Sequence, residues 1–290
     1  MRPRTRPAAL TYQEIRVAEK SSATETPETA DNVLYAAADG VATITINRAG
    51  AMNALDTDTK VALRDAVLRA ADDPDVRAVV LTGTGRAFCV GQDLKQHIEL
   101  LDVSPEVTFA TVKEHYNPLV TALATMQKPV VAAVNGVAAG AGAAIAFACD
   151  FRVVADTAGF NLAFAGVALT ADSGASWTLP RLVGHARATE LLMLPETIPA
   201  ARALELGLAT RVVPAADVAA EAGALAAKLA AGPTVAYGAI KEALAYGADH
   251  SIVETLAKED ELQLKAGRSA DHRIAVDAFL AKGKPEFTGK

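Results

Sequence analysis

Short apolar runs that alternate with glycine-rich turns and helical stretches constrain the fold of this chain most. Val76–Thr82 is a β-rich run that ends in a Gly-Thr-Gly turn, and Pro129–Val134 leads into a longer glycine-rich turn. A further buried strand is predicted at Phe151–Ala155. Helices are predicted to begin near Thr57 and to cover Pro105–Met126. Because strands alternate with helices, we expect an α/β fold with layered sheets.

Val33–Ala38 and Val41–Asn47 are predicted to form a β-hairpin at the start of this pattern. Both runs are apolar and rich in β-forming residues, and Asp39-Gly40 joins them. That dipeptide favours a two-residue turn, because both of its residues must adopt a positive φ. The helix that follows from Thr57 is expected to pack through an apolar stripe. Its members are Val61, Ala62, Ala66, Val67 and Ala70.

From about residue 215 onward the chain is predicted to be helical only. The last of these helices carries an apolar stripe that includes Ile274 and Phe279, and such a stripe needs a partner surface. We therefore divide the chain into a loosely ordered N-terminal extension over 1–30, an α/β core over 31–228 and a helical oligomerisation region over 229–290. The predicted helices are Ala215–Ala231, Thr234–Tyr246, Ser251–Lys265 and Ala270–Ala281.

Charge and hydropathy exclude several classes of partner. Lys and Arg number 28 against 34 Asp and Glu, which gives a net charge of −6, and the cations are scattered along the chain. A nucleic-acid-binding surface would need a concentrated basic face. No apolar stretch reaches the roughly 18 residues of a membrane span. The first thirty residues contain four glutamates, which transit peptides avoid, so a cytoplasmic location is favoured.

The usual metal and nucleotide motifs are missing. Cys89 and Cys149 lie far apart in apolar runs, which favours two small buried side chains in a reducing compartment. No P-loop, nucleophile elbow or complete dinucleotide-binding glycine motif is present. The five histidines are isolated, so no metal site is expected; they are His97, His115, His185, His250 and His272.

Two glycine-containing turns could supply backbone donors to one oxygen atom. Phe88–Leu94 follows one predicted strand, and Asn135–Ala144 follows another and runs into a helix. Glycine permits close approach of the backbone, and the start of a helix offers unpaired N–H groups. Brought together, the two turns would form an oxyanion hole. Each turn alone is better explained as a tight strand-to-helix connection.

The combination of these motifs resembles the crotonase (enoyl-CoA hydratase/isomerase) superfamily in order and spacing, over about residues 33–290. The resemblance rests first on Asn47-Arg48, Met52–Leu55, Ala87–Leu94 and Lys128–Val130 leading to Asn135-Gly136. Later stretches are similar to the ring-epoxide phenylacetyl-CoA isomerase branch. These are His115–Val120, Asp172–Gly174 with Trp177–Arg181, Gly267–Asp271, and the terminal Phe279–Lys282 and Phe287–Lys290.

This resemblance implies a crotonase-like spiral of ββα units with a C-terminal helical trimerisation region, often assembled as a dimer of trimers. It also implies that the backbone N–H groups of Gln92 and Ala141 bind the thioester oxygen. Alanine replaces a frequent glycine at 141 but keeps the N–H, provided that its φ is negative. The implied substrate-binding residues are Met52, Asn53, Ala54, Gly91, Asp93, Leu94, Lys95, Gly140 and, from a neighbouring subunit, Lys282.

The resemblance further implies which reaction is lost. Hydratases of this family use two glutamates, which align with Ala144 and Phe164, and neither residue can activate water. Isomerisation needs one carboxylate that moves a proton between two carbons. Asp172 matches the acid–base aspartate of the isomerase branch, although an aspartate before a helix is also a favoured N-cap. Three alanines depart from the branch pattern nearby, at Ala168, Ala171 and Ala175.

We therefore expect an acyl-CoA double-bond isomerase that acts on 3-enoyl or ring-epoxide phenylacetyl-type thioesters. No cofactor is expected, since coenzyme A is part of the substrate, and the expected assembly is a homotrimer or a dimer of trimers. Phe164 and Trp177 either line the acyl pocket or belong to the core. The alternatives are an enoyl-CoA hydratase, an aryl-CoA hydrolase or dehalogenase with Asp172 as nucleophile, and a non-enzymatic coenzyme-A-binding or RNA-binding module.

Overall fold

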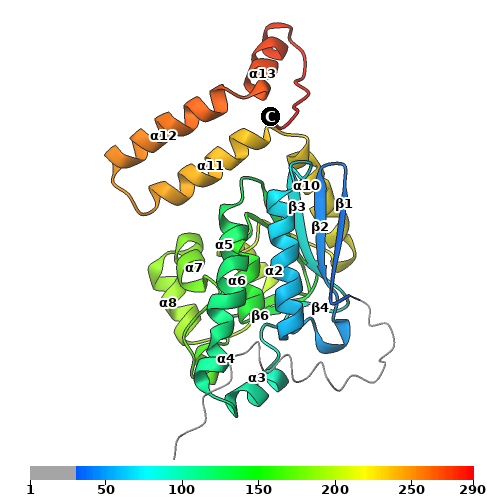
Figure 1. Ribbon diagram of the computed structural model, residues 1–290, viewed down its shortest axis with the longest axis vertical. Helices are drawn as coiled ribbons and strands as arrows, with labels where there is room; N and C mark the ends of the chain where they lie inside the picture. The colour runs from blue at the N-terminus through cyan, green and yellow to red at the C-terminus, as the bar shows by residue number, and fades with distance from the viewer. Residues whose placement is uncertain (1–30) are drawn as a thin grey trace, which may run out of the picture.

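The computed structural model describes residues 31–290, which form two sheets surrounded by helices (Figure 1). The larger sheet has the strand order β1-β2-β3-β5-β7-β10, and the smaller has the order β4-β6-β8-β9. The expected α/β fold with layered sheets is confirmed. The strands are β1 Val33–Ala38, β2 Val41–Ile46, β3 Ala78–Gly83, β4 Ala87–Cys89, β5 Val130–Val134, β6 Val137–Ala139, β7 Phe151–Ala155, β8 Gly159–Asn161, β9 Ile198–Pro199 and β10 Arg211–Val213.

The predicted hairpin is confirmed at the edge of the larger sheet. β1 and β2 pair antiparallel, and the two turn residues between them, Asp39 and Gly40, have φ angles of 51° and 76°. Positive φ at both positions is what a two-residue hairpin turn requires. From β2 through β3, β5 and β7 to β10 all neighbours pair parallel, so the carboxyl ends of these strands meet at one edge.

Helix α2, Thr57–Asp72, lies along this sheet beside α5, as the blue and green helices of Figure 1 show. Its buried face differs from the predicted stripe. Leu63 is fully buried, whereas Val61 and Ala62 are half-buried. The face that packs inward carries Thr57, Thr59, Lys60, Leu63, Val67 and Ala70. The prediction is confirmed for Val67 and Ala70 but missed Thr57, Thr59, Lys60 and Leu63, because it followed the apolar residues whereas the inward helical face runs through a lysine.

The helix predicted over Pro105–Met126 is divided into α4, Pro105–Thr111, a π-helical turn, Val112–Tyr116, and α5, Asn117–Thr125. In the π-helical turn the N–H of Asn117 donates to the carbonyl of Val112, five residues back. Pro118 explains this local widening, because a proline has no N–H and its ring crowds the carbonyl four residues before it. The turn directs His115 and Tyr116 inward, where both are buried.

The smaller sheet lies next to the core helix α6, Ala141–Ala148, all of whose residues are buried. β4 and β6 pair parallel, so the segments that follow them leave from the same edge. A Cβ at Gly142 would lie only 2.1 Å from the carbonyl oxygen of Cys89. Glycine at this position therefore lets the start of α6 lie directly against β4.

Helices cover both sheets and then extend beyond them. α10 packs against β3, β5 and β7 of the larger sheet, and α11 and α12 form a pair beyond the core (Figure 1). The helices not yet bounded are α3 Leu94–Leu101, α7 Ala175–Val183, α8 His185–Met193, α9 Ala200–Glu205, α10 Val218–Ala230, α11 Thr234–Gly247, α12 Ile252–Gly267 and α13 Ala270–Leu280, with short 3-10 turns at Ala49–Ala51, Ala165–Val167 and Ala215–Asp217.

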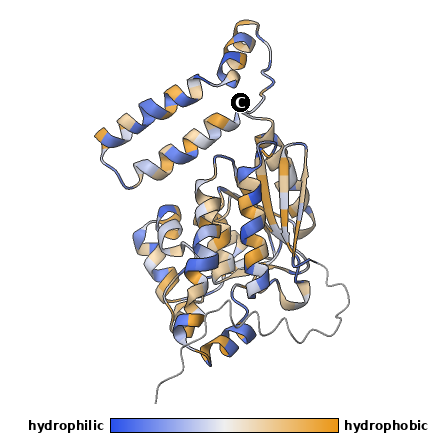
Figure 2. Cartoon of the chain, viewed as in Figure 1, coloured by the Kyte–Doolittle hydropathy of each residue, from blue (hydrophilic) through white to orange (hydrophobic). Residues whose placement is uncertain are grey.

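The C-terminal helices expose apolar side chains in the single chain. Figure 2 shows orange residues on α12 and α13, and Phe279 is 82% exposed. Predicted oligomerisation through this region stays a prediction, as does the division of the chain at residue 228, which falls inside α10. The predicted N-terminal extension, 1–30, lies outside the described residues. Within 31–290 no helix combines the length and hydropathy needed to cross a membrane.

Candidate active site

The turn after β4 holds Gln92 with its backbone N–H directed away from the neighbouring strand-like segment. Leu55 makes a parallel bridge to this turn: its N–H donates to the carbonyl of Gly91 at 2.7 Å, and its carbonyl accepts from Asp93 at 3.1 Å. In a parallel bridge the residue between the two bonded positions points its own N–H to the opposite side. The N–H of Gln92 is therefore left available on that side.

The second predicted turn meets the first at the start of α6. A Cβ at Gly91 would lie 2.8 Å from the carbonyl oxygen of Ala139 and 3.2 Å from the backbone nitrogen of Ala141. Gly91 has a φ of 86° and Gly140 a φ of 50°, so both turns use backbone that side chains rarely adopt. Ala141 is the first residue of α6, and the first N–H groups of a helix have no partner within it.

The two N–H groups assigned to the oxyanion hole thus come from turns that touch each other. Ala141 is not among the described residues with a positive φ, so replacing the usual glycine leaves the direction of its N–H intact. The positive end of α6 adds to the potential at this point. Such an arrangement can stabilise a negative charge that develops on a carbonyl oxygen.

Asp172 lies on the loop between the turn Ala165–Val167 and α7. Its carboxylate accepts a hydrogen bond from the Ser173 hydroxyl at 2.8 Å. Burial raises the pKa of Asp172, while the Ser173 hydrogen bond and the charge of Lys60 act in the opposite direction and leave a net increase. A carboxyl group with a raised pKa is a better match to proton transfer from carbon than an ordinary aspartate.

The Asp172 loop has unusual backbone geometry. Ser173 and Gly174 have φ angles of 51° and 74°, and Ala168 has a φ of 58° where the isomerase branch has glycine. Left-handed backbone at a residue with a side chain costs about 1–2 kcal/mol. Residues with such strained backbone angles persist only where the surrounding structure maintains them, and they are found most often at functional sites.

The alternative structural role of Asp172 as a helix cap is not seen. The N-cap of α7 is Gly174, and no side chain caps this helix. Asp172 contributes only its backbone carbonyl, which accepts from Ala175 at 3.0 Å. Its carboxylate is therefore directed elsewhere than to the helix terminus.

A buried hydrogen-bond network that the sequence did not reveal joins Gln92 to the π-helical turn. Lys60 Nζ donates to Gln92 Oε1 at 3.1 Å and to Thr111 Oγ1 at 2.7 Å. Tyr116 donates its hydroxyl proton to the same Gln92 oxygen at 2.7 Å. Thr111 Oγ1 lies 3.0 Å from His115 Nδ1. Gln92 is thus held from two sides by groups on α2 and on the turn before α5.

The charge of Asp172 acts on this network. Burial raises the pKa of Tyr116 well above its usual value, and the nearby Asp172 carboxylate raises it further. Burial lowers the pKa of Lys60 to about 8, while Asp56, Asp172 and Asp93 counteract the decrease. Lys60 and Tyr116 therefore link Asp172 electrostatically to the side chain of Gln92.

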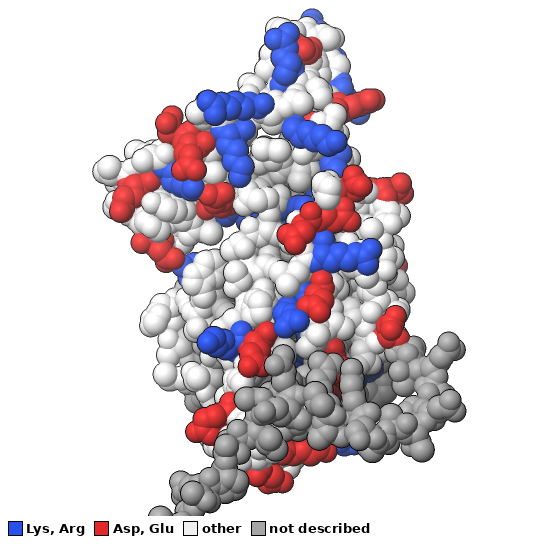
Figure 3. Space-filling view, in the orientation of Figure 1, with Lys and Arg blue, Asp and Glu red and all other residues white. Residues whose placement is uncertain are grey.

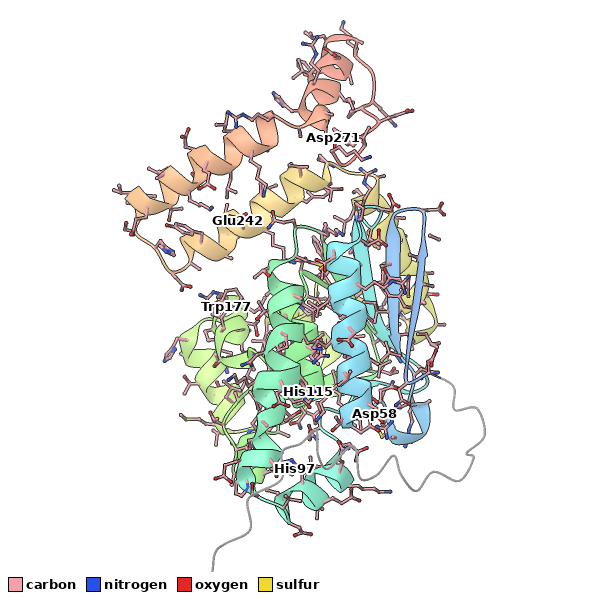
Figure 4. All side chains as sticks on the ribbon, viewed as in Figure 1. Asp58, His97, His115, Trp177, Glu242 and Asp271 are labelled. Carbon is pink, nitrogen blue, oxygen red and sulfur yellow. The ribbon has the colours of Figure 1, made fainter. Side chains whose placement is uncertain are left out.

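His115 remains neutral at ordinary pH. Burial, followed by the charges of Lys60 and Arg64, lowers the pKa of His115 to about 4. Because Lys60 donates to Thr111 Oγ1, the Thr111 hydroxyl is free to donate to Nδ1 of the neutral ring. Figure 4 shows His115 inside the molecule, near the lower half of α2.

Asp93, one of the predicted substrate-binding residues, directly follows Gln92 and is fixed by an ion pair and by helix capping. Arg48 pairs with Asp93 at 3.1 Å and with Asp56 at 2.9 Å. Asp93 caps α3 by accepting from the backbone of Lys95 and Gln96. Burial alone would raise the pKa of Asp93, but the hydrogen bonds from Arg48 and from these two N–H groups lower it. Asp93 is therefore held as a carboxylate, and it fixes the start of α3 next to Gln92.

Asn53 is fully buried, and its side chain is used entirely within the protein. Its amide group donates to the carbonyls of Thr84 at 2.9 Å and Ala87 at 2.8 Å. Its side-chain oxygen accepts from the backbone of Arg48 at 2.9 Å. The side chain of Asn53 thus has no atom left for the predicted substrate binding. It instead connects the segments that contain Arg48, Thr84 and Ala87.

The remaining predicted site residues differ in exposure. Ala54 is buried, and its carbonyl accepts from Arg48. Met52 is half-buried with a φ of 53°, and Leu94 and Lys95 are exposed at the start of α3. The fold brings these residues to the Gly91 turn through the bridge between Leu55 and Gln92.

Phe164, Trp177 and Lys282 occupy three different environments. Phe164 is buried, and its carbonyl accepts from Leu169 at 3.0 Å, which closes the turn before Asp172. Trp177 is 40% exposed and stacks on Arg181 beside a cavity of about 750 Å³ between α7 and α11. Figure 4 shows Trp177 at the end of α7 near α11, well away from His115. Lys282 is exposed after α13 and does not reach the site within one chain.

One sequence signal could have identified Lys60. It stands three residues before Leu63 and ten before Ala70, so it belongs to the same buried face of α2 as Leu63, Val67 and Ala70. A lysine in register with such a stripe indicates either a structural or a functional charge. Tyr116 lies in the stretch His115–Val120 that resembles the isomerase branch, but no periodicity marks it or Thr111 as a partner of Gln92, because the π-helical turn changes the register there.

The described residues contain no candidate metal cluster, and the face seen in Figure 3 has no continuous basic surface. Across residues 31–290, no group of three or more His, Cys, Asp and Glu side chains could hold a metal ion. Figure 3 shows basic and acidic side chains interspersed on the visible face, without a continuous basic surface. Cys89 and Cys149 are buried, and burial raises the pKa of each thiol to about 12.

Comparisons with known proteins give a consistent result. Residues 36–290 match the family model described as enoyl-CoA hydratase/isomerase. The chain is 40% identical to the 1,2-epoxyphenylacetyl-CoA isomerase of Escherichia coli K12 over 252 residues, covering 87% of this chain and 96% of the relative. It is 42% identical over 259 residues to a protein of Rhodobacter capsulatus described as "Probable enoyl-CoA hydratase", covering 89% and 98%.

A crystal structure from Mycobacterium abscessus, whose title names an enoyl-CoA hydratase/isomerase, superimposes on this chain with a TM-score of 0.86. It is 44% identical in sequence, and the alignment covers 89% of this chain and all of that one. The likeness therefore extends over the two sheets and the C-terminal helices alike.

Proposed function

The chain belongs to the enoyl-CoA hydratase/isomerase family, and we propose that it is an acyl-CoA double-bond isomerase with Asp172 as its single acid–base residue. The carboxylate of Asp172 removes a proton from C2 of a 3-enoyl thioester. The electron pair moves toward the thioester oxygen, which gives a dienolate. The resulting carboxylic acid then delivers its proton to C4, which yields the 2-enoyl thioester and restores the carboxylate.

Two backbone donors lower the energy of the dienolate in this proposal. The N–H groups of Gln92 and Ala141 hydrogen-bond to the thioester oxygen as its negative charge grows. Their direction does not depend on a side chain, because the Leu55 bridge and the start of α6 fix the two turns. No cofactor takes part, since coenzyme A belongs to the substrate.

The observation that carries the proposal is the placement of Asp172: its half-buried carboxylate lies on the loop that begins at Phe164, one of the two hydratase positions, and both of these positions are apolar. Ala144 is fully buried in α6, and Phe164 is buried at the start of the Asp172 loop. Neither side chain can activate water. Asp172 is left to do the proton transfer, and isomerisation requires only one such group.

The substrate class follows the same reasoning. Relatives named for an epoxyphenylacetyl-CoA isomerase and for an enoyl-CoA hydratase both act, by their names, on CoA thioesters. We propose that this chain binds an acyl-CoA whose reacting carbons lie next to the thioester, either a 3-enoyl chain or a ring epoxide of the phenylacetyl type. The exposed Leu94 and Lys95 at the start of α3 are then available to the coenzyme A part.

A side-by-side assay tests the proposal. Purified protein is supplied with a 3-enoyl-CoA and, separately, with crotonyl-CoA, and the conjugated 2-enoyl thioester is followed by its absorbance. We expect its appearance from the 3-enoyl substrate and little loss of it from crotonyl-CoA. Hydration of crotonyl-CoA at a rate comparable with isomerisation would contradict the proposal and favour the hydratase alternative.

We also propose that the chain assembles as a trimer or a dimer of trimers. The exposed Phe279 and Leu280 on α13, at 82% and 74% of their surface, support a partner surface there. Light scattering at micromolar concentration should give a mass at least three times that of one chain. A monomer under those conditions would rule out this assembly.

A further inference from the structure

Lys60 occupies a position that folding alone does not favour. It lies in the first turn of α2 and is 1% exposed. The N-terminal end of a helix carries a partial positive charge, which disfavours a cation in the first turn. Removal of an ammonium from water adds a second cost. A residue that meets both costs is more readily explained by function than by stability.

The hydrogen bonds of Lys60 do not balance its charge. Nζ donates to two neutral oxygens, Gln92 Oε1 and Thr111 Oγ1. It also lies 5.6 Å from the centre of the Tyr116 ring, where the ring face provides a further weak attraction. A buried ammonium requires a negative partner as well, and the nearby carboxylates that act on it are Asp56, Asp172 and Asp93.

Two of these three carboxylates already have a cation. Asp56 and Asp93 both pair with Arg48, at 2.9 and 3.1 Å. Asp172 makes no ion pair with any residue that the structure describes, and its carboxylate accepts from the neutral Ser173 hydroxyl. Among the described residues Asp172 thus has no cation in direct contact, and Lys60 is the cation whose charge acts on it.

We propose that Lys60 is a positioning residue of the isomerase site: its buried ammonium holds the side chain of Gln92 through Oε1 and places a positive charge near the Asp172 carboxylate. This inference rests on the proposed function of Asp172. Lys60 joins the two halves of the reaction, since Gln92 provides a backbone donor to the thioester oxygen and Asp172 moves the proton. It does not itself exchange a proton with the substrate.

The surroundings of Lys60 determine how the site responds to pH. Its own helix contributes Asp56 at the N-cap, α3 contributes Asp93, and the loop before α7 contributes Asp172. The π-helical turn contributes His115 and Tyr116, both neutral near pH 7, because burial lowers the pKa of the first and raises that of the second. Asp172 is thus the titrating group that loss of the Lys60 charge should affect most.

A titration that does not depend on turnover tests the inference. The protein is labelled with ¹³C at the aspartate carboxyl carbons, and the Asp172 resonance is identified by its absence in Asp172→Asn. In Lys60→Met the midpoint of this resonance should move upward by about one pH unit, since removal of an adjacent opposite charge disfavours the carboxylate. Lys60→Gln, which also lacks the charge, should give the same direction if Lys60→Met folds poorly.

Two matched variants separate charge from packing and hydrogen bonding. Tyr116→Phe removes the other donor to Gln92 Oε1 without changing any charge, and should leave the Asp172 midpoint in place. Lys128→Met removes a buried ammonium at the opposite end of α2, and should also leave it in place. Circular dichroism confirms the fold of each variant.

The pH dependence of kcat/KM provides a second test of the inference. In Lys60→Met the acid limb of the kcat/KM profile for the 3-enoyl thioester should shift upward by the same amount as the carboxyl midpoint. Turnover at pH 7 should fall roughly ten- to hundredfold, the usual effect of losing a group that positions a catalytic residue. An unmoved Asp172 midpoint in folded Lys60→Met and Lys60→Gln would overturn the inference. Absence of isomerase activity in the parent would instead overturn the proposed function, while the titration would still decide the pairing.

Discussion

The two buried lysines at opposite ends of α2 differ in what surrounds them. Lys128 reaches the C-terminal end, where Nζ donates to the carbonyls of Ala70 at 2.8 Å and Asp73 at 2.5 Å. The Ala70 carbonyl would otherwise lack a partner, because the residue four positions later is Pro74, whereas the Asp73 carbonyl also accepts from Val76 at 3.2 Å. Lys60 stands at the N-terminal end and donates only to the side chains of Gln92 and Thr111.

The helix dipole favours one of these lysines and disfavours the other. A cation beside the last carbonyls of a helix is stabilised, and a cation in the first turn is destabilised. Lys128 therefore stabilises the fold, whereas Lys60 lowers stability and is explained by its proposed role in the site. The same contrast separates Asp93, whose pKa is lowered by its hydrogen bonds, from Asp172, whose pKa is raised by burial.

Asn53→Asp should give the largest loss of stability at the N-terminal end of α2. The amide group of Asn53 donates to two backbone carbonyls, and a carboxylate there would face the same oxygens without a proton to share. We expect a loss of about 3–5 kcal/mol in the free energy of unfolding, as for an uncompensated buried charge. Urea denaturation measures it.

Asn47→Asp is the control for this change. Asn47 is half-buried, and its side-chain hydrogen bond to the carbonyl of Asp31 is exposed to solvent, so its substitution should cost little. Equal losses for the two variants would show that the buried anchor at Asn53 has no special role. Substitution of either asparagine would then have the same effect on the free energy of unfolding.

Lys128→Met and Lys60→Met should differ in stability by a smaller but clear amount. Lys128→Met leaves two carbonyls at the end of α2 without their charged donor, and we expect a loss of about 2–3 kcal/mol. Lys60→Met removes a cation that burial and the helix dipole disfavour, and should change stability by less than about 1 kcal/mol. Urea denaturation of both variants makes the comparison. A larger loss in Lys60→Met would reverse the roles assigned to the two lysines.

The pH dependence of stability should show the smallest effect. Because the pKa of Asp172 is raised in the folded protein, its proton binds the folded state more tightly than the unfolded one. The resulting stabilisation is fully present below the unfolded pKa and is lost as pH rises through the folded pKa. Asp172→Asn should therefore be at least as stable as the parent at pH 8, with the advantage shrinking toward pH 5. Thermal melts across this range measure it, and a variant that loses stability at pH 8 would contradict the sign.

Much of the fold could be predicted from the sequence because local rules determine it. Asp39-Gly40 demands positive φ at both positions, and the hairpin follows. The strand Phe151–Ala155 was predicted with its observed bounds, since apolar runs of this length are recognisable. The helix over Pro105–Met126 was not predicted in detail, because the effect of Pro118 on the preceding turn depends on three-dimensional packing.

The candidate site could be predicted only where the backbone carries the chemistry. The turns at Gly91 and Gly140 were predicted, and the structure brings them together. Lys60 was missed because its importance depends on groups that are distant in sequence, Thr111 and Asp172 among them. Trp177 was grouped with Asp172 because both belong to stretches that resemble the isomerase branch, but helix α7 places Trp177 beside the cavity that α11 also lines. Side chains that meet across the fold leave no local pattern to read.

Asp172→Asn provides the most direct measurement of the mechanism. Asparagine keeps the shape of the side chain and can still accept from Ser173, but it cannot take a proton from carbon. We expect turnover of a 3-enoyl thioester to fall at least about a hundredfold, the usual contribution of a positioned acid–base group. The melting temperature should hold or rise, and acyl-CoA binding should persist through the N–H groups of Gln92 and Ala141. Isomerisation at the parent rate in a folded Asp172→Asn protein would show that another residue moves the proton.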